Sequence, residues 1–200
     1  GTPRAFVHTL PGGATQGAAT RTQQYVKNVL IEQAVRDGDV MAQHEAKADT
    51  LGRKAREAKL AISLEKKMGK EEILQGYLNI AQFGRSVYGV ETAARHYFGV
   101  SAKDLNYLQA ATIAGITKAP STYDPTADPE KAQNRRNVVL NTMYQQGYIT
   151  KEEYDAGLAT PISDTLAIQP LEAGCQASGG SAFFCDYVTK VIMSDPVFGE

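Results

Sequence analysis

Apolar and polar positions follow the period of an α-helix along most of the chain between about residue 20 and residue 158. Side chains at i, i+3, i+4 and i+7 share one face of a helix, so this pattern predicts amphipathic helices. We find no convincing run of strictly alternating apolar and polar residues before residue 160. The pattern therefore predicts an all-α domain.

The segment from Arg53 to Met68 has apolar residues on two faces of its predicted helix. One stripe consists of Ala55, Ala58 and Ile62, and the other consists of Ala61, Leu64 and Met68. A helix that is apolar on two sides is usually buried on both. We expect this helix to be central in its domain.

Turn and capping residues predict the ends of the other helices. A helix from Lys70 to Phe83 should stop at Gly84. Three further helices are expected to begin at caps. A capping box at 101–104 should open a helix over 105–116, and Asp128 with Pro129 should open a helix that reaches 147. A capping box from Thr150 to Glu153 should open one more short helix.

The composition changes after Thr160, which indicates the end of the helical domain. Prolines and glycines mark a linker, and 183–193 resembles the start of another structured element. We expect a first domain over 1–160 and a linker with the beginning of a second domain over 161–200.

Charge and cysteine content narrow the function classes. The 200 residues carry a formal net charge of −1, and the basic residues are dispersed, so nucleic acid is not an expected partner. His8, His44 and His96 are too far apart to suggest a metal site. Cys175 and Cys185 favour a local disulfide and hence an oxidising compartment, with two unrelated thiols as the alternative.

Two polar clusters are candidates for binding an anion. The start of the first predicted helix is rich in hydrogen-bond donors and has no acid: Thr20, Thr22, Gln23, Gln24 and Lys27. A later helix carries Arg135 and Arg136, which either form a solvated face or face a phosphorylated ligand together with Lys27 and Arg53.

Glu57 is the candidate reactive carboxylate. It lies on the stripe of Ala61, Leu64 and Met68, with Arg53 four residues earlier. A carboxylate in this position is either paired and structural, or desolvated and available for chemistry. The adjacent cations Lys54 and Arg56 favour the second interpretation.

These stretches resemble motifs of the peptidoglycan glycosyltransferases (glycosyltransferase family 51). Residues 20–28 resemble the second motif, and 53–65 match the third, Arg-Lys-x-x-Glu-x-x-x-Ala-x-x-Leu-Glu, at every fixed position. Residues 70–79 and 135–143 resemble the fourth and fifth, and 94–99 and 119–125 resemble connecting segments. The resemblance covers about residues 12 to 160, with the motifs in the family's order.

The resemblance implies a lysozyme-like helical domain that polymerises lipid II into glycan strands with inversion, releasing undecaprenyl pyrophosphate. It implies that the enzyme acts at the extracytoplasmic face of the bacterial cell membrane and is held there by an N-terminal membrane anchor. It also implies that other cell-wall synthesis proteins are partners. Domain order resembles that of bifunctional class A penicillin-binding proteins, in which a transpeptidase domain follows the linker. Residues 161–200 contain no Ser-x-x-Lys signature of that second enzyme.

By motif position, Glu57 corresponds to the family's second essential glutamate and would assist the leaving pyrophosphate, directly through nearby cations or through a divalent cation (Mg²⁺ or Mn²⁺). The residues matching the donor and phosphate sites are Thr20, Thr22, Gln23, Gln24, Lys27, Arg53 and Lys54, with Arg135 and Arg136 in a supporting role.

The sequence departs from the family pattern at several points. The first motif, Glu-Asp-x-x-Phe-x-x-His, which carries the general base, is not found before Thr20, so we expect a truncated, inactive fragment. The family usually has Ser at the position of Ala19 and Ile or Leu at the position of Arg21. It often has Arg at the position of Asp49. A degenerate domain that only binds lipid II or partner proteins, and a lysozyme-like enzyme that cleaves peptidoglycan, are the alternatives.

Overall fold

The computed structural model describes residues 20–171 and 182–194. Within these ranges the chain is built from helices, and its only β-type feature is an isolated bridge between Gln82 and Tyr88. The all-α prediction is confirmed for the described residues.

The α-helices are α2 (Arg21–Arg36), α3 (Val40–Lys47), α4 (Leu51–Glu65), α5 (Lys70–Ile80), α6 (Val90–Phe98), α7 (Tyr107–Ile116), α8 (Pro129–Gln145), α9 (Lys151–Ala159) and α10 (Ala182–Ser194). Two short 3₁₀ helices, η1 (Ala102–Asp104) and η2 (Ile162–Thr165), lie between them.

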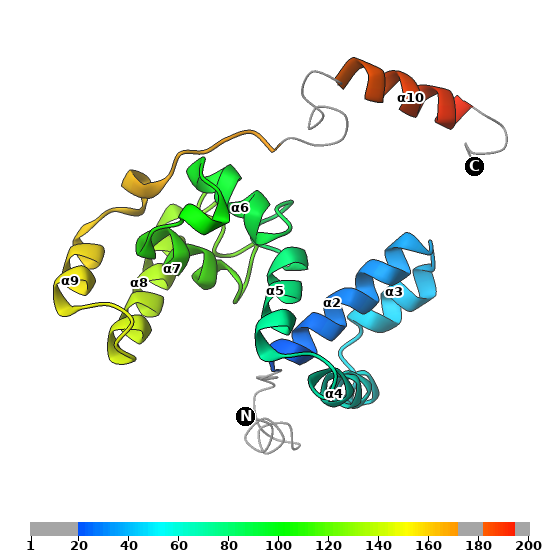
Figure 1. The fold of residues 1–200 in the computed structure, drawn as a ribbon, viewed down its shortest axis with the longest axis horizontal. Coiled ribbons are helices and arrows are strands. Elements are labelled where there is room, and N and C mark those ends of the chain that lie inside the picture. The colour runs from blue at the N-terminus through cyan, green and yellow to red at the C-terminus, as the bar shows by residue number, and fades with distance from the viewer. Residues whose placement is uncertain (1–19, 172–181, 195–200) are drawn as a thin grey trace.

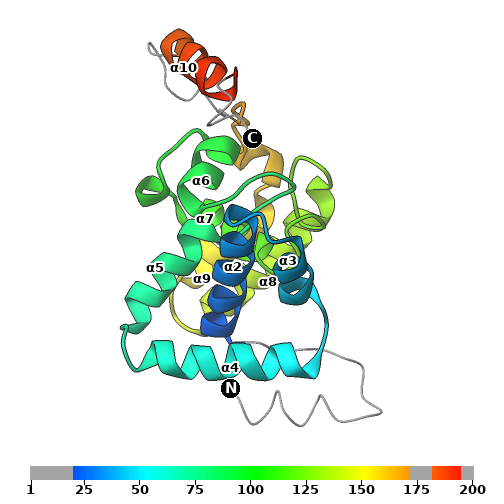
Figure 2. The same cartoon turned by 90° about the vertical axis from the view of Figure 1, so that its right-hand side faces the viewer.

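The helices from α2 to α9 form two groups that α5 joins. In one group, α2 packs against α3, α4 and α5; in the other, α7 packs against α6 and α8, and α8 packs against α9 and η2. Helix α5 contacts both α2 and α6, and Figure 1 shows it between the two groups. Helix α4 runs across one end of α2 (Figure 2).

The main core lies where α5, α6 and α7 meet. Its buried side chains are Tyr77, Ala81, Phe83, Val87, Ala93, Tyr97, Phe98, Ile113 and Ile116. A second apolar cluster joins α7 to α8 and to Ile149, and beside it the rings of Tyr144 and Tyr154 stack 5.2 Å apart. Both clusters therefore lie away from α4.

The bend between α5 and α6 is fixed by a buried polar network. The Tyr97 hydroxyl donates to the Phe83 carbonyl at 2.8 Å, and burial together with the neighbouring Asp124 carboxylate raises its pKa. Burial alone would raise the pKa of Asp124, but hydrogen bonds from the Thr126 hydroxyl and amide and from the Arg85 amide hold it below its usual value. These bonds tie the bend to the loop before α8.

The predicted caps were correct in two cases and wrong in one. Asp128 and Thr150 accept hydrogen bonds from the amides of Lys131 and Glu153, as expected. The box at 101–104 is wrong, because the Ser101 hydroxyl donates to Glu91 and the cap of α7 is Asn106 with Gln109.

Helices α5 and α8 end earlier than predicted. Helix α5 stops at Ile80, well before Gly84, because Ala81 is extended. Helix α8 ends at Gln145 rather than reaching Gly147, which follows with a φ of 73°.

The prediction that α4 is central is wrong. Its buried residues are Glu57 and Ala61 on one stripe, whereas Ile62 on the other stripe is 55% exposed and Leu60 is 40% exposed. Only the stripe that contains Glu57 packs against the domain. The second stripe lies at the molecular surface of the chain.

Beyond α9 the chain continues across α6. The amides of Ala167 and Gln169 donate to the carbonyls of Tyr97 and His96 at 2.8 and 2.7 Å. Farther along, α10 covers the segment predicted to be structured at 183–193. The predicted disulfide between Cys175 and Cys185 falls outside what the structure describes and stays a prediction.

No helix within the described ranges is long and apolar enough to cross a membrane.

Gly84 offers a test of the packed bend. A Cβ at this position would lie 2.2 Å from the Tyr97 hydroxyl and 2.9 Å from the Asp124 carboxylate. Because both groups are held by other hydrogen bonds, we expect Gly84→Ala to lower the free energy of unfolding by about 1–3 kcal/mol in urea titrations. Gly52→Ala is the control: no atom lies within 4 Å of its Cβ position in α4, so it should stabilise by about 0.5–1 kcal/mol.

Candidate active site

The polar residues at the start of α2 first serve the helix itself. The Thr20 side chain accepts from the Gln23 amide at 3.2 Å, and the Gln23 side chain accepts from the Thr20 amide at 2.8 Å. This reciprocal capping box satisfies two backbone donors that a helix leaves unpaired. Part of the polar run is therefore explained by helix capping.

A second contact fixes the start of α2 against the end of α4. The buried Thr22 hydroxyl donates to the Glu65 carboxylate at 2.5 Å. Glu65 is the last glutamate of the stretch that resembles the third motif, yet no role for it was predicted. The contact joins 22 to 65 across 43 residues, which no local spacing could indicate.

The unusual Arg21 points away from this contact. Its guanidinium donates to Gln24 at 3.2 Å and lies 5.9 Å from the centre of the Tyr77 ring on α5. An arginine over an aromatic face is a favourable arrangement. Arg21 and Gln24 thus form a surface pair on the α5 side of α2.

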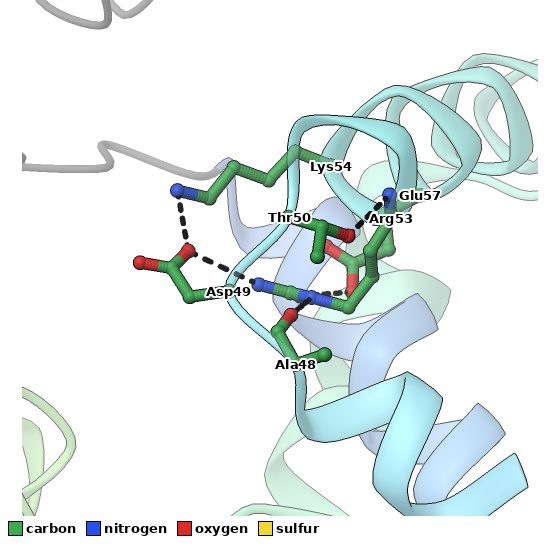
Figure 3. A network of polar contacts seen from close by, with 6 residues as sticks. All are labelled: Ala48, Asp49, Thr50, Arg53, Lys54 and Glu57. Carbon is green, nitrogen blue, oxygen red and sulfur yellow. Dashed lines mark hydrogen bonds and ion pairs between the residues drawn. The ribbon is translucent and has the colours of Figure 1, made fainter. Parts of the chain in front are cut away.

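Glu57 is buried on α4, with Arg53 as its partner. One guanidinium nitrogen of Arg53 donates to the Glu57 carboxylate, and its Nε donates to the Ala48 carbonyl (Figure 3). The Thr50 side chain caps α4 by accepting from the Arg53 amide at 3.2 Å. Of the two alternatives for Glu57, a paired structural carboxylate or a desolvated one available for chemistry, the structure shows features of both, because the carboxylate is buried and is also paired with Arg53.

Asp49 brings further cations to the same place. Lys54 Nζ lies 2.6 Å from Asp49 Oδ1, and a guanidinium nitrogen of Arg53 lies 3.8 Å from the same oxygen. The hydrogen bond and charge of Lys54, aided by Arg53 and by Lys27 of α2, lower the pKa of Asp49. Arg53 and Lys54 thus both contact the Asp49 carboxylate, and Lys27 of α2 lies near enough for its charge to act on it.

A hollow of about 360 Å³ lies among α2, α3 and α4 beside this group. Arg53 and Glu57 form part of its wall, and Leu30, Ala42 and Ala46 supply an apolar part. We call Lys27, Asp49, Arg53, Lys54 and Glu57 the α2–α4 cluster.

Arg136 is not part of the α2–α4 cluster, which corrects its prediction as a phosphate-facing cation. Its side chain is 0% exposed, and its guanidinium donates to the carbonyls of Gly157 and Thr160 at 3.1 and 2.7 Å. Burial lowers its pKa. Arg136 instead anchors the end of α9 to α8, because carbonyls at a helix end lack partners of their own.

Arg135 faces the other neighbour of α8. It is half-buried, and its Nε lies 3.4 Å from the Gly115 carbonyl of α7. The alternative of a solvated face is also wrong, since Arg136 is 0% exposed and Arg135 is half-buried against α7. The arginine pair connects helices in the half of the fold remote from α4 (Figure 1).

The carboxylates at the α2–α4 cluster form a weak donor set for a metal ion. Within the described residues, no group of three or more His, Cys, Asp or Glu side chains is arranged to hold one. Glu57 is already paired with Arg53, and Asp49 with Lys54. Cations of the chain itself occupy the positions next to these carboxylates.

Comparison with known proteins supports a family assignment. A family model described as "Transglycosylase" matches residues 1–144. The chain is 45% identical over 181 residues to penicillin-binding protein 1A of Streptococcus oralis, covering 90% of the chain and 26% of that protein. It is 40% identical over 197 residues to penicillin-binding protein 1A of Haemophilus influenzae, covering 98% of the chain and 20% of that protein.

A crystal structure of penicillin-binding protein 1A from Haemophilus influenzae is also similar, with a TM-score of 0.46 and 28% identity. The match covers 89% of this chain and 20% of that one. The chain thus spans about a quarter or less of the length of these relatives.

Arg136 can be tested by a change that keeps its charge. The Arg136 guanidinium also donates to the Asn137 side chain at 3.0 Å. A lysine cannot reach Asn137 and the two carbonyls at once, so Arg136→Lys should lower the free energy of unfolding by about 2–4 kcal/mol in urea titrations. Arg135→Lys is the control and should cost less than about 1 kcal/mol, because it gives up one long hydrogen bond. Unchanged stability of Arg136→Lys would contradict the anchoring role.

Proposed function

The chain belongs to the transglycosylase family, and from this membership we propose that it is a peptidoglycan glycosyltransferase domain that polymerises lipid II into glycan strands. The observation that carries the proposal is the α2–α4 cluster, in which Arg53 joins the buried Glu57 carboxylate to Asp49, Lys54 contacts Asp49, and the charge of Lys27 acts on Asp49 from α2. Such a site suits a reaction whose leaving group is a pyrophosphate.

In the proposed reaction, the 4-hydroxyl of the acceptor sugar attacks the anomeric carbon of the lipid-linked donor. The new glycosidic bond forms with inversion as the bond to the pyrophosphate oxygen breaks, and the hydroxyl proton passes to a general base. Negative charge grows on the leaving pyrophosphate. Fixed cations placed where charge develops are the usual means of lowering such a barrier.

Each residue of the cluster has a place in this scheme. Arg53 and Lys54, which share an oxygen of Asp49, would bind phosphate oxygens, and Lys27 would contribute a third positive charge. Glu57 holds the Arg53 guanidinium in position from its buried side. The amide side chain of Gln24 and the hydroxyl and amide side chains of the α2 cap would bind sugar hydroxyls or phosphate oxygens.

The family resemblance allows a divalent cation to assist the leaving pyrophosphate. The residues present fit it poorly, because each carboxylate of the cluster already has a basic partner within the chain. A cation that arrived with the phosphates would need no more than one carboxylate from the protein. We derive no step through a metal ion.

Two other functions remain in view. A lysozyme-like hydrolase would share a helical fold and an active glutamate, but it has no use for three cations beside that glutamate. A domain that only binds lipid II would keep the cations without turnover. The cluster thus favours the transferase over the hydrolase, and activity separates it from the binder.

We propose lipid II and the growing glycan strand as ligands, and the extracytoplasmic face of the cell membrane as the place of action. Other cell-wall synthesis proteins are proposed partners. These proposals rest on the family and on the names of relatives, since penicillin-binding proteins 1A are among the similar sequences.

Polymerisation of lipid II tests the function. An extended protein, in which the family's first motif is placed ahead of Gly1, is assayed beside the 200-residue chain. Polymer from the extended protein alone, with none from the 200-residue chain, would support both a glycosyltransferase and the inactivity expected of the shorter chain. Binding of lipid II by both, with polymer from neither, would favour the binding domain.

Glu57→Gln in the extended protein should reduce polymerisation by about a hundredfold or more, because the charge that holds Arg53 is lost. The amide oxygen of Gln can still accept from Arg53, so the thermal transition should persist. The control is Glu152→Gln, an exposed residue of α9 outside the motif stretches, which should polymerise at the parent rate. A parent rate from Glu57→Gln would make Glu57 structural.

A further inference from the structure

Asp49 is a carboxylate in the middle of the cations that would receive a ligand's phosphates. It lies in the short connection between α3 and α4, after the C-cap residue Ala48 and before the N-cap residue Thr50. We propose that Asp49 is the resident counter-ion of the anion site formed by Lys27, Arg53 and Lys54, and that a phosphate-bearing ligand displaces its carboxylate on binding.

The contacts place Asp49 where an anion would bind. Lys54 Nζ lies 2.6 Å from Asp49 Oδ1, and Arg53 approaches the same oxygen at 3.8 Å. Figure 3 shows the carboxylate between the two side chains, on the side of Arg53 away from Glu57. A phosphate oxygen bound by Lys54 and Arg53 would occupy this position. The two anions therefore compete for the same donors.

The Asp49 carboxylate is also able to leave. Its side chain is 71% exposed, whereas the side chain of Glu57 is 6% exposed. Exposed ion pairs contribute little free energy, because water and salt replace the partner at small cost. Breaking the buried Glu57–Arg53 pair would leave an unpaired buried charge. A ligand can thus exchange with Asp49 and not with Glu57.

The charge balance gives this exchange a consequence for specificity. With Asp49 in place, three cations face two carboxylates. A ligand with a single negative charge gains little over the carboxylate that it replaces. A pyrophosphate carries more charge and can meet both Lys54 and Arg53, which already approach one oxygen of Asp49, so the resident carboxylate favours it over singly charged anions.

A purely structural role for Asp49 makes a different prediction. An acid just before the N-cap stabilises the positive end of a helix. If this were its only role, loss of the carboxylate would destabilise α4 without changing the affinity for anions. Anion affinity and thermal stability therefore separate the two roles.

The test titrates the 200-residue chain with inorganic pyrophosphate by calorimetry at about 0.1 M ionic strength, where the screening length is about 10 Å. Asp49→Asn should lower the Kd about three- to fivefold, the gain expected when one exposed competing charge is removed. Asp49→Lys, which adds a fourth cation, should lower it further. The tightening should shrink in a Lys54→Met background, because Lys54 is the main partner of Asp49.

Asp37→Asn is the matched control, since it removes the same charge at the exposed end of α2. It lies ten residues from Lys27, about 15 Å along the helix axis, and salt screens that separation. An equal gain from Asp37→Asn would overturn the proposal. So would an unchanged Kd for Asp49→Asn, with or without a lowered melting temperature, or no binding by any variant at millimolar pyrophosphate.

The inference rests on the proposed function for the identity of the ligand, but its test does not require turnover. If Asp49→Asn lowers the Kd for pyrophosphate but the extended protein makes no polymer, the proposed anion site stands and the proposed transferase function fails. If the extended protein makes polymer but Asp49→Asn leaves the Kd unchanged, the transferase function stands and the counter-ion role of Asp49 fails.

Discussion

The candidate site depends on the contacts that one side chain, that of Arg53, makes with its neighbours. Its guanidinium binds Glu57 one turn along α4, the carbonyl of Ala48 before the helix, and the outer carboxylate of Asp49. A planar guanidinium with several fixed donors can hold such partners in different directions, whereas a lysine ammonium cannot. Through this one residue, the buried acid, the start of α4 and the surface charges keep a fixed arrangement.

The sequence was a good guide where the cause of a structure lies within one or two helical turns. The stripe of Glu57 and Ala61, the caps at Asp128 and Thr150, and the pairing of Glu57 with Arg53 all follow from spacing along a helix. Motif similarity added Lys27, which lies on another helix and joins the cluster only in the folded chain.

The sequence was a poor guide where the partner lies far along the chain. Ser101 could cap a helix, but Glu91 takes its hydroxyl, and Asn106 caps instead. The apolar residue Ile62 predicts burial, yet the helices that could cover it pack elsewhere in the described chain. Arg136 resembled a surface cation, and its true partners, Gly157 and Thr160, follow 21 and 24 residues later.

The Glu57 carboxylate is buried and the Asp49 carboxylate is exposed, and this difference gives the two groups different roles. Glu57 and Arg53 meet away from water, where their attraction is strong and the loss of either charge is costly. Asp49 and Lys54 meet in water, where their attraction is weak and reversible. A site that must hold its geometry and still exchange anions needs both kinds of pair. Because Arg53 belongs to both pairs, a ligand that replaces Asp49 meets a guanidinium already fixed from behind.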